Sequence, residues 1–226
     1  MQKRINEVDV LRGFAVVLMV IFHSFVDLYD FFGVGISYHE GIIYLIGRAA
    51  AFIFIFVSGV SAELSGNNLK NAARTFLAGL AVSIATYFFD SETFVIFGIL
   101  QFLSFCMLSS HFSKKYPPWI FIVFVSVSVI IGLLITDLTA PFWWLLPFGV
   151  YPASFQSVDY YPIFPYISIF FAGNFFGRIT YVRKREPLLK DFDFSPLSFL
   201  GRHSLAIYLV HQPVIYGVFY LLFMII

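Results

Sequence analysis

"EVDVLRGFAVVLMVIFHSFVDLYD", residues 7–30, decides the fold class because it contains an apolar run that could cross a lipid bilayer. About 20 apolar residues in a helix span a hydrocarbon core of about 30 Å. Similar runs recur along the 226-residue chain, in which 60% of residues are hydrophobic and only 12% are charged. Soluble domains contain about 25% charged residues. The sequence therefore predicts an all-α polytopic protein, integral to the cell membrane and multi-pass.

Seven transmembrane helices are expected, separated by segments rich in Gly, Pro, Asn and Ser: 10–30, 41–65, 70–89, 92–112, 118–136, 162–181 and 198–225. Residues 142–151, with two tryptophans, should lie at the interface or dip back into the membrane, because Trp favours the headgroup region. The chain is expected to form one domain over residues 1–226. No cleavable signal peptide is expected, because the first apolar run ends in His23 and Asp27 rather than in small residues.

Charge gives the orientation. If the N-terminus is inside, every Lys and Arg except Arg48 falls in an inner segment, and the charged residues of the outer loops are all acidic. This asymmetry predicts a cytoplasmic N-terminus and an external C-terminus. The single cysteine, Cys106, excludes an internal disulfide. The five histidines have no paired ligand spacing, so we expect no metal site, and no nucleic-acid partner is expected.

Several polar residues lie deep in these spans. His23 is about 16 Å along its helix from Arg12, and Arg48 is about 12 Å below the outer boundary, so the two share a depth. His211 falls near the midplane of the last span. A charge at the bilayer centre costs at least about 2.5–3.5 kcal/mol, so these residues should face one polar cavity. The expected cavity set is His23, Asp27, Arg48, Gln101 and His211, although each alone could instead tie helices together.

Four blocks of the sequence resemble the heparan-α-glucosaminide N-acetyltransferase catalytic domain family, within a wider group of transmembrane acyltransferases. They are "EVDVLRGFAVVLMVIFH" (7–23), "GRAAAFIFIFVSGVSAEL" (47–64), "DYYPIFPYISIFFAGNFFGR" (159–178) and "FLGRHSLAIYLVHQPVI" (199–215). The blocks occur in the family's order and cover most of the chain except the third to fifth spans. The chain is shorter than the animal enzymes, so the resemblance does not carry over the substrate.

The resemblance implies transfer of an acetyl group from cytosolic acetyl-CoA to a glucosamine amine on the other side. The family's catalytic histidine, just after the first span, falls on His39, with a one-residue gap to Ser58–Gly59. The more distant relatives use a histidine late in the first span, which falls on His23. Both histidines are present here, so the catalytic assignment is open between them.

The acyl donor is anionic and should be held at the basic inner face. The residues expected to bind acyl-CoA there are Arg12, Lys114, Lys115, Arg178 and Arg202. The acceptor, a carbohydrate or cell-envelope glycan with an amine or hydroxyl, would enter from the acidic outer face. The alternatives are a small transporter with a polar mid-membrane site and a non-catalytic scaffold. Apolar outer faces would also support a homodimer.

Overall fold

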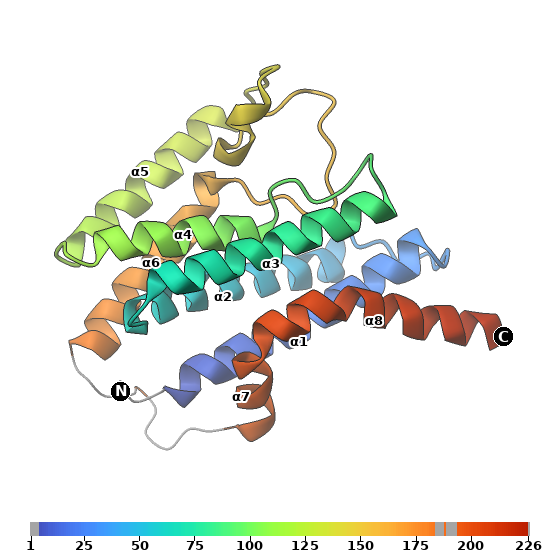
Figure 1. The fold of residues 1–226 in the computed structure, drawn as a ribbon, viewed down its shortest axis with the longest axis horizontal. Helices are drawn as coiled ribbons and strands as arrows, with labels where there is room; N and C mark the ends of the chain where they lie inside the picture. Colours follow the sequence, from blue (N-terminus) through green and yellow to red (C-terminus); the bar gives the residue numbers. More distant parts are fainter. Residues whose placement is uncertain (1–4, 184–187, 189–193, 226) are drawn as a thin grey trace. The chain divides into compact units, whose positions relative to one another are not determined.

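The computed structural model describes residues 5–183, 188 and 194–225, and the regular secondary structure of this part of the chain is helical, with one isolated bridge between Thr139 and Tyr151 (Figure 1). The elements in chain order are α1 (Asn6–Asp30), α2 (Gly41–Leu64), α3 (Asn68–Phe89), α4 (Ile99–Ser113), α5 (Trp119–Ile135), η1 (Trp143–Phe148), α6 (Ile163–Gly177), η2 (Arg178–Val182), α7 (Ser195–Arg202) and α8 (Ser204–Ile225). The all-α prediction is confirmed for the described residues.

Within the described residues, four helices are long and apolar enough to cross a membrane: α1, α2, α3 and α8. The helices α4 and α5 are apolar but shorter, with 15 and 17 residues, or about 22 and 25 Å. The fourth span was expected from residue 92, but α4 starts at Ile99 because the chain first forms a polar turn at Asp90. In that turn Asp90 accepts hydrogen bonds from the Glu92 amide and the Thr93 hydroxyl. The number of spans and the side on which each terminus lies remain predictions.

One expected segment differs from the sequence prediction. The last span was expected as one helix over 198–225, but it breaks at His203, whose backbone leaves the helical region at φ −105° and ψ 14°. The break separates the short α7 from α8. Residues 143–148 form a 3₁₀ helix of six residues, about 12 Å long, which is too short to cross a membrane.

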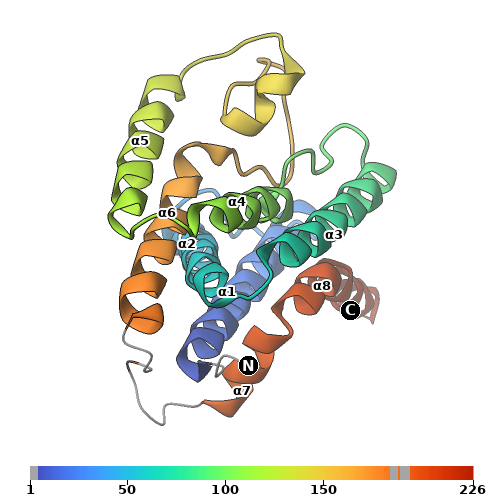
Figure 2. The ribbon, with the colours of Figure 1, turned by 60° about the vertical axis from the view of Figure 1, so that its left-hand side comes forward.

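The chain divides into two compact units, with the boundary inside α2. Unit 1 comprises Met1–Val57 and Pro187–Ile226, and unit 2 comprises Ser58–Glu186. In unit 1, α7 and α8 both pack against α1, so the first helix lies beside the last two helices of the sequence (Figures 1 and 2). In unit 2, α3 packs against α4, and α5 packs against α6.

Glycines set the contact between α1 and α7. A Cβ atom added to Gly13 would lie 2.0 Å from the Leu197 carbonyl oxygen, and one added to Gly201 would lie 1.9 Å from the Asp9 carbonyl oxygen. Because no other residue lets two helix backbones approach so closely, these glycines hold α7 on the first turns of α1. Arg12 reinforces the contact with a hydrogen bond to the Gly201 carbonyl at 3.5 Å.

Candidate functional site

Two histidines meet inside unit 1. His23 on α1 and His211 on α8 lie with their ring centroids 4.9 Å apart in an edge-to-face arrangement. His211 is buried, and its Nδ1 lies 2.6 Å from the Tyr208 carbonyl oxygen. Since a carbonyl oxygen only accepts, Nδ1 carries the proton, and Nε2 of a neutral ring is then the basic nitrogen. Nε2 is buried and has no hydrogen-bond partner among the described residues.

A carboxylate and an amide lie beside the pair: Asp27 is one turn beyond His23 on α1, and Gln212 directly follows His211 on α8. Asp27 is fully buried, and the Gln212 Nε2 donates to its Oδ1 at 2.5 Å. Asp27 Oδ2 and Gln212 Oε1 are buried without a hydrogen-bond partner in the described part of the chain. Buried polar atoms are almost always hydrogen-bonded, so open atoms on neighbouring groups indicate a place for water or a polar ligand. The sequence analysis missed Gln212, although an amide next to His211 in an apolar run was a usable signal.

His39 lies in the loop after α1 and is exposed. A row of ring contacts, which we call the aromatic row, leads from it to the histidine pair. The centroid separations are 4.1 Å from His39 to Tyr38, 6.0 Å from Tyr38 to Phe22, and 5.4 Å from Phe22 to His23. His39 therefore lies at the outer end of the row rather than against His23. The two candidate catalytic histidines are in one unit but separated by two rings.

Arg48 on α2 was expected at the depth of His23. The residues that precede His23 and Arg48 lie close together, because a Cβ atom added to Gly47 would lie 2.6 Å from the Phe22 ring, and the depth of the two residues in a membrane stays a prediction. The Arg48 side chain is exposed and its guanidinium lies near two rings of its own helix, 5.8 Å from Tyr44 and 5.0 Å from Phe52. Cation–π contacts of this kind hold the side chain along its own helix.

Comparison with known proteins was made against families, curated proteins and solved structures. The model of one family, described as heparan-alpha-glucosaminide N-acetyltransferase, catalytic, matches residues 4–213. The chain belongs to this family. No curated protein and no solved structure matches the chain. Membership in the heparan-alpha-glucosaminide N-acetyltransferase family, together with the long apolar helices, indicates a transmembrane acetyltransferase.

The region that matches the heparan-alpha-glucosaminide N-acetyltransferase model includes a second buried polar cluster, in unit 2. Arg178 forms a two-point ion pair with Glu63, with Nε to Oε2 at 2.7 Å and Nη2 to Oε1 at 3.1 Å. Asn174 donates to Glu63 Oε1 at 3.0 Å and to the Ser110 hydroxyl at 2.7 Å. Arg178 also donates to the Tyr116 carbonyl. Sequence analysis missed Glu63, although a carboxylate in the last turn of an apolar helix was a signal.

Arg178, expected to bind the acyl donor, is thus buried with its guanidinium directed at Glu63. The other expected donor residues are more accessible. Lys114 is half-buried and donates to the Ser65 carbonyl at 2.5 Å, while Lys115 is exposed. Burial lowers the pKa of the Lys114 ammonium, although the nearby Glu63 charge acts in the opposite direction.

The two remaining donor candidates lie in unit 1. Arg12 forms an ion pair with Asp9 at 3.0 Å. Arg202 is exposed, and its Nε donates to the Ser198 carbonyl at 3.1 Å. Both residues belong to the α1–α7 contact, at the opposite end of α1 from the histidine pair.

Gln101, expected in the polar cavity, lies in unit 2 and ties α4 to α3. Its Nε2 donates to the Gly79 carbonyl at 3.0 Å and to the Ser83 hydroxyl at 2.7 Å, and its Oε1 accepts from the Gly98 amide at 3.1 Å. These bonds give Gln101 the helix-tying role that was its alternative interpretation.

Proposed function

We propose that the protein is a transmembrane acyltransferase that moves an acetyl or other acyl group from cytoplasmic acyl-CoA to a carbohydrate or cell-envelope acceptor on the outer side. The family assignment supports the reaction class. The observation that carries the site is the histidine pair together with three buried polar atoms that have no hydrogen-bond partner among the described residues: Asp27 Oδ2, His211 Nε2 and Gln212 Oε1. These atoms can accept a proton and bind a small polar substrate. A contact that only holds two helices together would not need polar atoms without partners.

In the proposed reaction, the acceptor amine or hydroxyl attacks the thioester carbonyl. A neutral imidazole takes the acceptor's proton as the new bond forms, the C–S bond breaks, and the CoA thiolate leaves and is protonated. His39 and His23 are the candidate bases, with His39 favoured by the family pattern and His23 by its buried surroundings. An acyl-histidine intermediate is the two-step form of the same transfer.

Asp27 and Gln212 are proposed to hold the acceptor rather than to react. An ionised carboxylate can accept hydrogen bonds on both oxygens, and Asp27 uses one of them for Gln212. The second oxygen would accept from the acceptor's amine or hydroxyl. Arg48 is proposed to support the developing oxyanion or a carboxylate, and the donor's phosphates are assigned to the basic residues of the inner segments, among which Lys115 and Arg202 are exposed.

The test is transfer of labelled acetyl from acetyl-CoA to glucosamine by purified protein in liposomes. A general base contributes about 10²- to 10⁴-fold, so His23→Gln or His39→Gln should lower kcat by that factor. His111→Gln is the matched control, because His111 is exposed and lies in unit 2. The control should keep wild-type activity.

Two results would overturn the proposal. Acetylation that persists in the double variant His23→Gln/His39→Gln would eliminate both residues as the base. Folded wild-type protein that neither binds acetyl-CoA at millimolar concentration nor acetylates any sugar amine or hydroxyl would favour the transporter interpretation, in which the histidine pair is a solute or proton site.

A further inference from the structure

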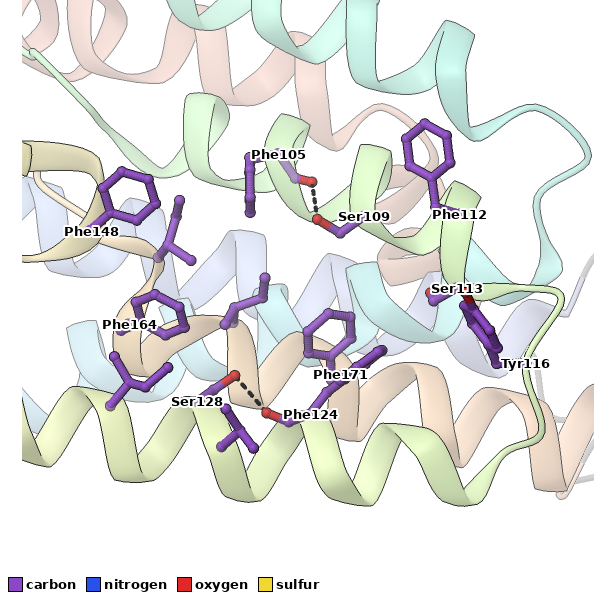
Figure 3. A pocket seen from close by; sticks show the side chains of 14 residues that line it. Phe105, Ser109, Phe112, Ser113, Tyr116, Phe124, Ser128, Phe148, Phe164 and Phe171 are labelled. Atoms are coloured by element: carbon purple, nitrogen blue, oxygen red, sulfur yellow. Dashed lines mark hydrogen bonds between the residues drawn. The ribbon is translucent and has the colours of Figure 1, made fainter. Parts of the chain in front are cut away.

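Unit 2 contains an apolar cavity of about 370 Å³ between α4, α5 and α6 (Figure 3). Its volume lies at the lower end of the range for sites that bind small organic molecules, about 300–1,000 Å³. Aromatic side chains dominate its wall, including Phe105 from α4, Phe124 from α5 and Phe171 from α6. None of these residues belongs to the histidine pair or to the aromatic row.

The serine hydroxyls in the wall are already used. Ser109 donates to the Phe105 carbonyl at 3.0 Å, and Ser128 donates to the Phe124 carbonyl at 2.6 Å (Figure 3). Ser113 likewise donates to the Ser110 carbonyl at 3.2 Å. Because each serine hydroxyl hydrogen is directed at the backbone of its own helix, the wall between the two ends presents little to a polar ligand and suits hydrocarbon, while Tyr116 lines one end.

The cavity is elongated along the helices and reaches the outer surface of unit 2. On α4 it extends from Phe105 to Ser113, about 12 Å along the helix axis. Several wall residues are partly exposed: Phe105 at 39%, Val127 at 46% and Phe148 at 43%. This outward-facing position in an apolar helical protein places the opening where bilayer lipid would lie.

The two ends of the cavity differ in charge. Tyr116 and Ser113 line one end, and the Lys115 ammonium lies 5.2 Å from the Tyr116 ring centroid. Phe148 and Phe164 line the other end, where the nearby segments after α5 and before α6 carry Asp137 and Asp159 and no Lys or Arg. An amphiphile with a negative head would therefore enter with its head toward Lys115.

We propose that this cavity binds one hydrocarbon chain of an anionic bilayer lipid, with the lipid's phosphate held by Lys115. The chain would lie between α4, α5 and α6 in contact with Phe105, Phe124 and Phe171. The head would lie at the Tyr116 end, where the exposed Lys115 ammonium lies 5.2 Å from the Tyr116 ring centroid. The proposal uses no residue of the histidine pair. It takes Lys115, which is also a candidate for binding acyl-CoA, for the lipid phosphate instead, and competition with CoA distinguishes the two ligands.

The test uses delipidated protein in detergent and measures binding of phosphatidylglycerol and of phosphatidylcholine with the same chains, by native mass spectrometry. Val127→Trp would fill the cavity and should weaken phosphatidylglycerol binding at least tenfold. Val129→Trp is the matched control, because Val129 is on the same helix, is 39% exposed and does not line the cavity. It should bind like the wild type.

Lys115→Gln should reduce phosphatidylglycerol affinity about fivefold and leave phosphatidylcholine unchanged. Equal affinity of the wild type for both lipids, or displacement of phosphatidylglycerol by excess CoA, would overturn the assignment of Lys115 to a lipid phosphate. Equal effects of the two tryptophan variants would overturn the cavity itself.

Photolabelling of the wild-type protein tests the same cavity if Val127→Trp does not fold. Phosphatidylglycerol with a photoactivatable group in its chain should label peptides from α4, α5 and α6 that line the cavity. Labelling spread evenly over other exposed apolar residues, such as Leu77 at 64% exposed or Leu221 at 62% exposed, would contradict a specific site.

Discussion

Removing Arg178 should destabilise the protein because its partner is buried with it. The relative exposure of Glu63 is 7% and that of Arg178 is 8%, and two hydrogen bonds join them. Arg178→Ala leaves the Glu63 carboxylate with only the Asn174 amide as a donor in the described structure. Breaking a buried ion pair from one side costs about 3–5 kcal/mol, so we expect a loss of that size in the free energy of unfolding.

Two further variants separate the pair from a general effect of mutation. Arg183→Ala, which removes an exposed arginine five residues on, should change the free energy of unfolding by no more than about 0.5 kcal/mol. Glu63→Leu/Arg178→Met removes both charges and should recover much of the loss, since apolar replacements of whole pairs are often neutral.

The assay is thermal unfolding in one detergent, followed by the loss of monodisperse protein on size exclusion, together with acetyl-CoA binding at a temperature where every variant is folded. Arg178→Ala that unfolds like the wild type but no longer binds acetyl-CoA would refute the structural role and return Arg178 to the donor site. Lower stability with intact acetyl-CoA binding at low temperature is the result we expect.

Two other predictions follow from single contacts. Gly13→Ala should strongly destabilise unit 1, because its Cβ would lie 2.0 Å from the Leu197 carbonyl oxygen. Gly217→Ala, whose Cβ would meet no atom within 4 Å, should instead stabilise its helix by about 0.5–1 kcal/mol. Equal unfolding temperatures for the two variants would contradict the α1–α7 contact. Burial, and then the hydrogen bond and charge of Asp30, raise the pKa of Tyr38 to about 12, so its contribution to stability holds below pH 10 and is lost as the pH rises toward 12. Asp30→Asn should lower that pKa in a phenolate absorbance titration read against Tyr38→Phe, and an unchanged titration would exclude the Asp30 contribution.

The helical fold could be predicted because hydrophobicity and length are local properties of the sequence. The apolar runs gave the four long helices, with bounds close to those observed. Local patterns did not predict the helix break at His203. That break separates α8 from α7, which packs against α1 through Gly13 and Gly201. Local patterns also did not give the late start of α4, since residues 92–98 are apolar enough to extend it while Asp90 closes a turn with Thr93.

Position along a helix was the part of the site that sequence could supply. Helical rise predicted one depth for His23 and Arg48, and the structure brings their neighbours Phe22 and Gly47 together, while the membrane depth itself stays a prediction. Depth says nothing about rotation around a helix axis, however. His23 faces His211, whereas Gln101, at a comparable position in its own helix, turns toward α3 and bonds to Gly79 and Ser83.

The state of the buried polar atoms separates the structural cluster from the candidate site. In unit 2 the buried Glu63 and Arg178 are paired with each other, and the buried side-chain atoms without a hydrogen-bond partner in the described part of that unit are the amide oxygens of Asn68 and Asn174. In unit 1 the open atoms include a carboxylate oxygen of Asp27 and the Nε2 of His211, both of which can exchange a proton. A buried group of that kind costs free energy when it has no hydrogen-bond partner, so its presence here indicates a ligand that supplies the missing hydrogen bond. A ligand that donates hydrogen bonds, such as the amine or hydroxyl of the proposed acyl acceptor, is the kind of partner that would fit these two atoms.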